Sequence, residues 1–258
     1  MSTSAREQFD RQAALYDNRW AKWSDALLTQ MLAWADPQPQ WRVLDVATGT
    51  GYTALALAPH VAHVTGADVS PNMLGQAARQ AQEQGITNAD WQEARAERLP
   101  FDDASFDLVT VRIAPHHFTD VRAFLSETRR VLKVGGVFVL GDTSVPDDAP
   151  AVAEWQNAVE RVRDTSHVAN LSARAWRELT EEAGLRVSDV QTQTGEIALT
   201  LSAWLAVAGT DGDRAAQVRQ MFANASDDAR RAFHITTDKA GETHFAWPRV
   251  LLRAHRAA

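Results

Sequence analysis

The chain places two glycines and an acid at positions that suit the binding of a nucleotide-type cofactor. A mostly apolar run at 43–46 leads into Gly-Thr-Gly at 49–51, and the next apolar run, 61–67, ends in Asp68. Glycines let the backbone approach a ligand closely, and an acid at the end of the following strand can accept hydrogen bonds from ribose hydroxyls. The spacing therefore predicts a cofactor loop between two strands.

The glycine loop by itself leaves the identity of the cofactor open. Residues 49–54 fit the G-x-G-x-x-A pattern of dinucleotide-binding loops, and Asp68 lies near the offset of about 20 residues expected for a ribose-binding acid. The pattern is compatible with NAD, with FAD, with S-adenosylmethionine, and with an ordinary tight turn between a strand and a helix.

The two acids also have structural alternatives. Asp68 precedes Ser70 and Pro71, a good N-cap and first residue of a helix, so it could serve only as a capping acid. Asp45 interrupts the first apolar run. It could hold the cofactor's ammonium group, bond to backbone N–H groups of the loop, or do both.

His116 and His117 are the candidate catalytic residues, because they follow the strand predicted at 106–112. A histidine at the carboxyl end of a strand can act as a general base near neutral pH. The alternative is a histidine that only packs or caps a helix. A His-His pair can also bind metal, but no carboxylate cluster nearby in the sequence completes a site, so we expect no metal.

The second half of the chain offers candidate substrate-binding residues. The polar segment 161–168 contains Arg163, which could clamp an anionic group, and His167. The alternative for this segment is a solvated helix end. Trp20 and Trp204 lie in segments expected to cover the site and could form apolar walls, although core packing is the usual role of a tryptophan.

Alternating strand and helix patterns predict a mainly parallel sheet covered on both faces. The strands are expected at 42–47, 62–68, 89–94, 106–112 and 137–140, and the helices between them at 51–59, 71–84 and 119–132. Helical patterns also occupy 5–35, 151–163, 172–183 and 198–232, the last broken at 209–212; further strands are expected at 185–193 and 246–254. Ligands of such sheets bind at the carboxyl ends of the strands.

Composition narrows the class of protein. The chain has 258 residues, a net charge of −7 and no cysteine. The negative charge disfavours nucleic acid or an anionic membrane as a partner, and the lack of cysteine excludes disulfides and thiolate catalysis. No segment approaches the ~20 apolar residues of a membrane span, and residues 1–30 lack a signal-peptide pattern, so we expect a cytoplasmic protein.

An ordered set of motifs resembles one family. The set comprises 44–51, 66–74, 96–101 with 105–107, and 130–136, and it is preceded by Phe9, Ala14, Tyr16 and Asp17. These segments resemble the motifs of class I S-adenosylmethionine-dependent methyltransferases, and within them the small-molecule branch that includes the ubiquinone/menaquinone-type enzymes.

The resemblance implies a fold and an activity. The fold is an α/β, Rossmann-like sheet of seven strands, mostly parallel with an antiparallel last strand, in a single domain. Its cofactor-binding core spans about 38–145, with cap helices at about 1–35, 148–183 and 196–235. The activity is methyl transfer from S-adenosylmethionine, released as S-adenosylhomocysteine, to a small-molecule acceptor by in-line displacement.

The resemblance and the residue types together define the candidate site. The expected cofactor-binding residues are Tyr16, Asp45, Ala47, Gly49, Gly51, Asp68, Val69, Met73, Arg95, Ala96 and Arg112. The expected catalytic residues are His116 and His117, and the expected substrate-binding residues are Trp20, Arg163, His167 and Trp204.

Two departures from the family pattern stand out. Arg95 occupies the position where the family usually has an acid that meets the adenine amino group. Residues 16–23 lack the run typical of quinone-ring methyltransferases, which argues against a quinone acceptor. The alternatives are an NAD(P)-dependent oxidoreductase, for which neither Tyr16 nor Tyr52 has a lysine four residues on, and a non-catalytic cofactor-binding module.

Overall fold

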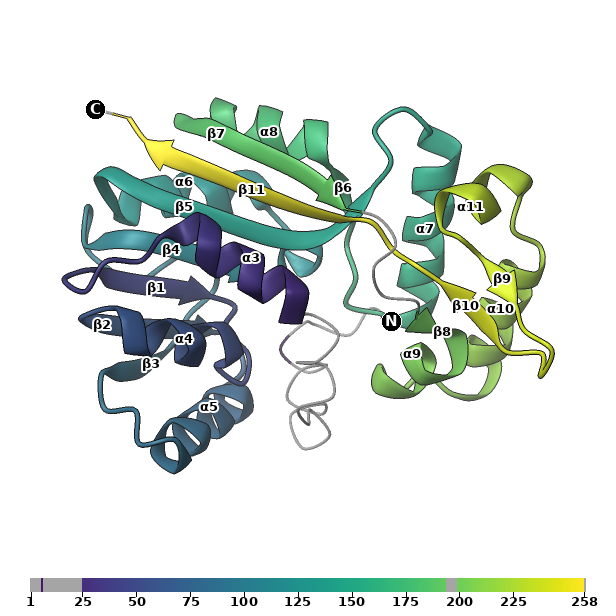
Figure 1. Ribbon diagram of the computed structural model, residues 1–258, viewed down its shortest axis with the longest axis horizontal. Helices are drawn as coiled ribbons and strands as arrows, with labels where there is room; N and C mark the ends of the chain where they lie inside the picture. Colours follow the sequence, from purple (N-terminus) through teal and green to yellow (C-terminus); the bar gives the residue numbers. More distant parts are fainter. Residues whose placement is uncertain (1–5, 7–24, 194–198, 258) are drawn as a thin grey trace.

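The computed structural model describes residue 6, residues 25–193 and residues 199–257 of the chain (Figure 1). Its centre is a twisted sheet in the order β3-β2-β1-β4-β5-β11-β7, to which the short β6 (Leu171–Ser172) adds beside β5. The seven main strands are β1 (Arg42–Val46), β2 (His63–Asp68), β3 (Ala89–Glu93), β4 (Phe106–Arg112), β5 (Leu132–Val145), β7 (Leu185–Gln193) and β11 (Arg249–Arg256).

The directions of the strands confirm the expected fold class. Strands β1 to β5 pair in parallel, and β11 pairs antiparallel with both β5 and β7. Within the described residues of this seven-stranded path, β11 alone therefore runs against the others. The last strand begins at Arg249, later than the expected start at residue 246, because Pro248 has no N–H to donate to a sheet ladder.

Helices cover the two faces of the sheet. On one face, α3 (Asp25–Ala35) and α4 (Tyr52–Leu57) share a buried core with β1, β2 and β5. Gly141 of β5 allows α3 to approach the sheet closely, since a Cβ at this position would lie 2.6 Å from the Met31 sulfur. On the other face, α6 (Val121–Val131) and α8 (Ala173–Glu182) bury Phe124 and Trp176. Helices α3 and α8, which fall in the ranges expected for the cap, thus pack on the sheet.

Four further helices form a separate cap with its own core (Figure 1, right). They are α7 (Pro150–Arg163), α9 (Leu201–Val207), α10 (Gly212–Ala223) and α11 (Asp227–Ala232). A small antiparallel sheet in the order β8-β10-β9 joins them, from β8 (Leu199–Thr200), β10 (Thr243–Phe245) and β9 (Thr236–Thr237). The sequence did not predict this sheet, because its strands are only two or three residues long.

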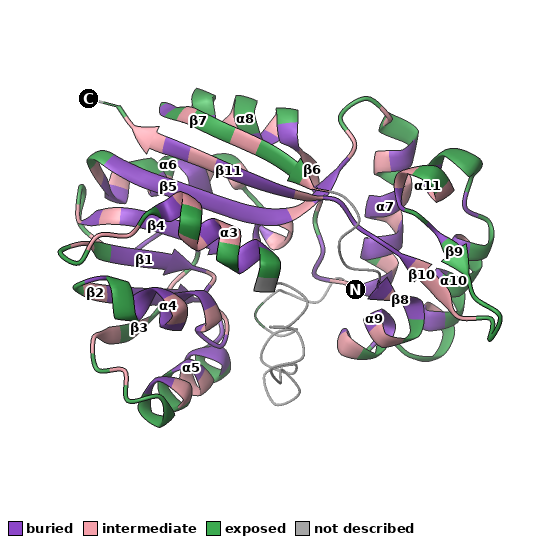
Figure 2. Cartoon of the chain, in the orientation of Figure 1, coloured by how far each residue is buried: buried purple, intermediate pink, exposed green. Residues whose placement is uncertain are grey.

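Aromatic side chains fill the cap core, which appears as a buried interior in Figure 2. The Trp204 ring centroid lies 5.0 Å from that of Phe245 and 5.8 Å from that of Trp247. Phe233 and Trp247 are 4.7 Å apart, edge to face. Such contacts stabilise a core beyond the burial of area alone. The cap is therefore held by a core distinct from the one beneath the sheet.

The helix that follows the second strand begins as predicted. Helix α5 (Pro71–Glu83) has Ser70 as its N-cap, and the Ser70 hydroxyl accepts the N–H of Met73 at 3.1 Å. Pro71 takes the first helical position, where the missing N–H costs nothing. Among the described residues, no helix combines the length and apolar character that crossing a membrane requires.

Candidate active site

The loop after β1 has a backbone conformation that few side chains tolerate. Ala47, Gly49 and Gly51 have φ angles of 53°, 56° and 83°. The Asp68 carboxylate fixes this loop to the end of β2, because one of its oxygens accepts the Gly49 N–H at 2.8 Å. The other oxygen accepts the Ser70 N–H at 2.9 Å. Asp68 is thus a fixed carboxylate beside the glycine loop.

The two glycines of the loop have different surroundings. A Cβ on Gly51 would lie 2.8 Å from the Trp91 ring and 2.9 Å from the Ala77 side chain, so Gly51 allows close packing. A Cβ on Gly49 would meet no atom within 4 Å. The loop backbone therefore faces open space at Gly49, next to the Asp68 carboxylate. An acid and exposed backbone beside open space fit a ribose-bearing cofactor.

Asp45 lies beneath the loop. Its carboxylate accepts the Thr48 hydroxyl at 2.6 Å and the Thr110 hydroxyl at 2.7 Å, and the residue is 1% exposed. Burial raises the pKa of Asp45 to about 6, against the lowering effect of the two hydroxyl hydrogen bonds. The side chain therefore ties the loop to β4. A contact with the cofactor's ammonium group stays a prediction.

The other predicted cofactor residues surround the same edge of the sheet. Arg112, at the end of β4, donates from Nε to the Thr53 hydroxyl at 2.9 Å and lies over the Tyr52 ring at 5.1 Å. The Arg95 side chain is 63% exposed, with Glu97 3.5 Å away. Val69 is half-buried, and Met73 and Ala96 are buried. Tyr16 lies outside the described residues.

Three histidines from two segments distant in the sequence come together beyond the end of β4. The 3-10 turn η2 (Pro115–His117) brings the rings of His116 and His117 to a centroid distance of 4.2 Å. The ring of His167, in the loop after α7, lies 5.5 Å from that of His116. The Val168 N–H also bonds to the His116 carbonyl at 2.9 Å, which joins the two segments.

Each histidine has a different polar partner. Asp142, in the second half of β5, has its Oδ1 2.7 Å from the Nδ1 of His116. The Ser166 hydroxyl lies 3.1 Å from the Nδ1 of His117, and the side-chain Oδ1 of Asn157 lies 3.1 Å from the Nε2 of His167. These contacts fix the orientation of all three rings.

The partners give the histidines different proton affinities. Burial acts to lower the pKa of His116, but the Asp142 carboxylate outweighs it and raises that pKa above its ordinary value. Burial and the neighbouring His116 lower the pKa of His117. Burial and the two other histidines lower the pKa of His167. His116 is therefore the strongest base of the three.

Arg163 and Trp204 contact each other within the cap. The Arg163 guanidinium lies 4.2 Å above the Trp204 ring, and its Nε donates to the Trp204 carbonyl at 3.2 Å. Its Nη1 also donates to Glu160 at 3.2 Å. Trp204 is 2% exposed. A substrate-binding role for either residue stays a prediction, and Trp20 lies outside the described residues.

Sequence reasoning missed Asp142, Asn157 and Ser166, the partners of the three histidines. The sequence could have indicated Asp142, because it is an acid that follows the apolar run 137–140, much as Asp68 follows the apolar run 61–67. Asn157 and Ser166 gave no such signal, because polar residues in a helix and a loop are common. Among the described residues, no group of three or more His, Cys, Asp or Glu side chains is placed to hold a metal ion.

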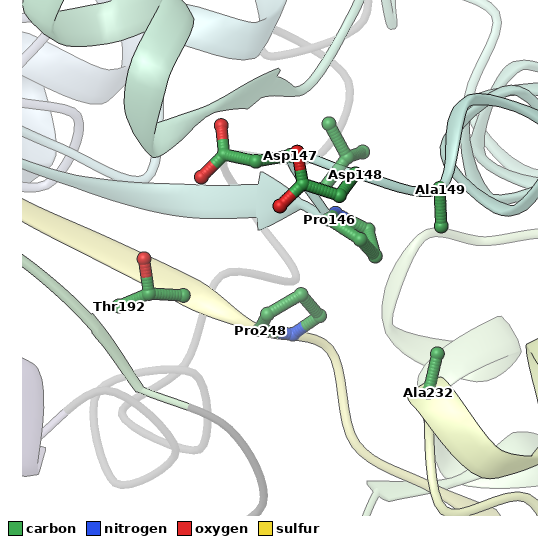
Figure 3. Close-up of a pocket in the computed structure, with 8 residues that line it drawn as sticks. Pro146, Asp147, Asp148, Ala149, Thr192, Ala232 and Pro248 are labelled. Carbon is green, nitrogen blue, oxygen red and sulfur yellow. The ribbon is translucent and has the colours of Figure 1, made fainter.

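A cavity of about 420 Å³ lies where the cap joins the sheet (Figure 3). It is lined by Val145, Pro146, Asp147, Asp148, Ala149, Thr192, Ala232 and Pro248. These residues come from the end of β5 and the segment that joins it to α7, from β7, from α11 and from the residue before β11, and none belongs to the cofactor loop. The cavity is therefore distinct from the region around Gly49 and Asp68.

The fold and the glycine loop define an α/β domain with a candidate cofactor site, and comparison with known proteins shows the family to which it belongs. Residues 44–140 match the family described as "Methyltransferase domain". The uncharacterised methyltransferase YcgJ of Bacillus subtilis is 37% identical over 234 residues, with 91% of each chain covered. The chain belongs to this family of methyltransferases.

Solved structures support the same assignment. The crystal structure of YcgJ superposes with a TM-score of 0.84 at 36% identity, covering 90% of this chain and 98% of that one. A Bacillus halodurans protein assigned as a methyltransferase superposes with a TM-score of 0.85 at 28% identity, covering 90% and 99%. The ubiquinone/menaquinone C-methyltransferase UbiE of Brucella anthropi is 42% identical over 123 residues, 45% of each chain.

Proposed function

We propose that the protein transfers the methyl group of S-adenosylmethionine to a small-molecule acceptor. The observation that carries this proposal is the pairing of Asp68 with the backbone of Gly49 at 2.8 Å, beside open space. A carboxylate at this position can accept both ribose hydroxyls, and charge-assisted hydrogen bonds are worth about 1.5–3 kcal/mol each. The family to which the chain belongs supports the same cofactor.

The described residues proposed to hold the cofactor come from β1, β2 and β4 and from the segments that follow β1, β2 and β3. They are Asp45, Ala47, Gly49, Gly51, Asp68, Val69, Met73, Arg95, Ala96 and Arg112, with Tyr16 from the N-terminal segment. Asp68 would bind the ribose, and Gly49 would let the backbone approach the ligand. S-adenosylmethionine supplies, when bound, a methyl group already activated by a positively charged sulfur.

The chain's own contribution to the reaction is positioning, exclusion of water and removal of a proton. Holding two reactants in a productive orientation can supply several kcal/mol of the barrier reduction, on the order of 7–11 in the best cases. The cap segments that carry Arg163 and His167 would exclude water from the acceptor. A histidine of η2, His116 or His117, would take the acceptor's proton.

Calorimetry tests the cofactor. S-adenosylhomocysteine should bind with one-to-one stoichiometry, and NADH should not bind. A ligand present at 100 times its dissociation constant should stabilise the fold by about 2.7 kcal/mol, which a thermal shift would detect. Binding of NADH without binding of S-adenosylhomocysteine would favour an oxidoreductase and contradict the proposal.

A second experiment separates an enzyme from a binding module. The protein is incubated with methyl-labelled S-adenosylmethionine and a low-molecular-weight metabolite extract, and the label is followed into new small molecules. Enzyme-dependent transfer is the expected result. The opposite result is tight binding of S-adenosylhomocysteine with no transfer of label to any molecule of the extracts tested. That result would support the non-catalytic binding module and contradict the catalytic proposal.

A further inference from the structure

Asp142 is fixed by its neighbours before any ligand is present. It is 1% exposed, and its Oδ1 accepts the Thr143 N–H at 2.8 Å while its Oδ2 accepts the His116 N–H at 3.0 Å. The same Oδ1 lies 2.7 Å from the Nδ1 of His116. One carboxylate therefore bonds both the backbone and the ring of His116, so the ring has little freedom to rotate.

This geometry determines which ring nitrogen carries the proton. An ionised carboxylate can only accept, so the Nδ1 of His116 must donate, and the lone pair of a neutral ring then lies on Nε2. Across the described residues, the Nε2 of His116 makes no hydrogen bond. The side chain retains 13% exposure. A free lone pair on a fixed ring is what a general base requires.

The pair lies at the same edge of the sheet as the cofactor loop. Asp142 follows Gly141, which pairs with Arg112 at the end of β4. Strand β4 pairs in turn with β1, where Val46 lies beside Val111 and the glycine loop begins. The carboxyl ends of β1 and β4 are therefore adjacent to the part of β5 that carries Asp142, and His116 lies in the 3-10 turn that follows β4.

We propose that Asp142 is a positioning residue that orients His116 as the general base, and that the acceptor therefore arrives with a proton on the atom to be methylated. The acceptor class is then a hydroxyl, an N–H group or an acidic C–H. This inference rests on the proposed function. In the step, the acceptor–hydrogen bond breaks and the proton goes to Nε2 of His116, while the new bond to the methyl carbon forms. The electron pair of the broken sulfur–carbon bond stays on sulfur.

The charged and titratable groups around His116 come from every element packed against it. They are His117 of η2, Asp142 of β5, Glu160 and Arg163 of α7, and Asp164 and His167 of the following loop. Asp142 is the one in hydrogen-bond contact with the His116 ring. The Asp164 carboxylate instead accepts the Ser166 hydroxyl at 2.7 Å, which in turn contacts His117.

The test uses the full-length Asp142→Asn protein and side-chain NMR of its histidines. Two-bond proton–nitrogen spectra, with the His116 signals assigned through His116→Gln, should show wild-type His116 as the Nδ1–H tautomer. In Asp142→Asn the titration of His116 should move to lower pH. Asp238→Asn is the matched control, because it removes an exposed carboxylate 3.0 Å from His244 and should leave His116 unchanged.

Turnover provides the second readout. With any acceptor that the labelling experiment identifies, His116→Gln should lower kcat by about 10²–10⁴-fold. Asp142→Asn should lower it less and move the acidic limb of the pH–rate profile to lower pH. The affinity for S-adenosylhomocysteine should stay the same in both variants.

Several results would overturn the inference. A wild-type His116 found as the Nε2–H tautomer would do so even if Asp142→Asn fails to fold. So would an unmoved His116 titration in Asp142→Asn, or full turnover in His116→Gln. Failure of the wild-type protein to bind S-adenosylhomocysteine would instead count against the proposed function, so the failure of the inference and the failure of the proposed function are distinguishable.

Discussion

The contact that fixes the glycine loop on the cofactor side lies within consecutive elements, β1 to β2, whereas the contacts of the acceptor side join η2 to β5 and to the loop after α7. On the cofactor side, Asp68 bonds to Gly49 across one strand–helix–strand unit. On the acceptor side, His116 bonds to Asp142, and its neighbour His117 bonds to Ser166 beyond α7. The glycine loop and its acid can thus be assembled locally, while the acceptor site depends on the docking of the cap.

We expect the largest effect from Trp204→Ala, which should destabilise the cap on the acceptor side and leave cofactor binding nearly unchanged. Trp204 packs in the aromatic core of the cap and beneath the Arg163 guanidinium. Truncating a buried tryptophan should lower the free energy of unfolding by about 3–5 kcal/mol. Chemical denaturation measures this loss. Affinity for S-adenosylhomocysteine should change little, because the contacts of the Trp204 ring within the described residues are with the cap residues Arg163, Phe222, Phe245 and Trp247. A large loss of affinity in the folded variant would show that the two sides are coupled.

The next largest effect is expected from Asp68→Ala on the cofactor side. Losing charge-assisted hydrogen bonds to the ribose should weaken S-adenosylhomocysteine binding by about 10- to 1000-fold, or roughly 1.5–4 kcal/mol. Calorimetry measures the affinity. Asp90→Ala is the control, because it removes only a surface pair with His63 of β2. Equal affinity in folded Asp68→Ala and wild type would leave Asp68 with only its loop-fixing role.

Asp45→Asn tests the raised pKa of the buried Asp45 carboxyl. The quantity compared is the free energy of unfolding of wild type and variant as a function of pH. The folded-state pKa of about 6 exceeds the ordinary value of 3.8, so the folded protein binds the proton more tightly. The wild type should therefore gain stability relative to Asp45→Asn as the pH falls from about 6 to 4, by roughly 3 kcal/mol, and lose it as the pH rises again. Urea unfolding at a series of pH values gives the difference. A difference that is constant with pH would contradict the raised pKa.

We expect the smallest effects from replacing two glycines, Gly49 and Gly85, with alanine. Gly49 and Gly85 have φ angles of 56° and 69°, and a Cβ on either would meet no atom within 4 Å. Each change to alanine should cost about 1–2 kcal/mol of stability, because alanine disfavours positive φ. Only Gly49→Ala should also weaken S-adenosylhomocysteine binding, since its Cβ would occupy the open space by the loop. Thermal unfolding and calorimetry measure the two quantities. Equal affinities would place the cofactor elsewhere.

The sequence was informative where structure is local. The Gly-Thr-Gly loop, Asp68 and the Ser70–Pro71 helix start were all recognisable because backbone conformation and capping depend on a few adjacent residues. The number of main strands and the antiparallel direction of the last one followed from the family resemblance. The length of β5 did not follow from either source: it was expected to span 137–140 but runs from Leu132 to Val145, since pairing with β4 and β11 extends it.

The acceptor side was harder to predict because its contacts are long-range. His116 and His117 were candidates from their place after β4, but nothing in the sequence paired His116 with Asp142 of the next strand. The three-residue β10 of the cap became a strand only by pairing with β8 and β9. Helices α3 and α8 were predicted as helices, yet their packing on the sheet depends on partners such as Gly141, distant in sequence.

The most direct test of the account is a crystal structure of the protein with S-adenosylhomocysteine. The account predicts that both ribose hydroxyls bond to the Asp68 carboxylate, that the ligand passes over Gly49, and that its sulfur faces the space next to Nε2 of His116. A ribose bound away from Asp68, or a sulfur on the side of the ligand opposite η2, would contradict it.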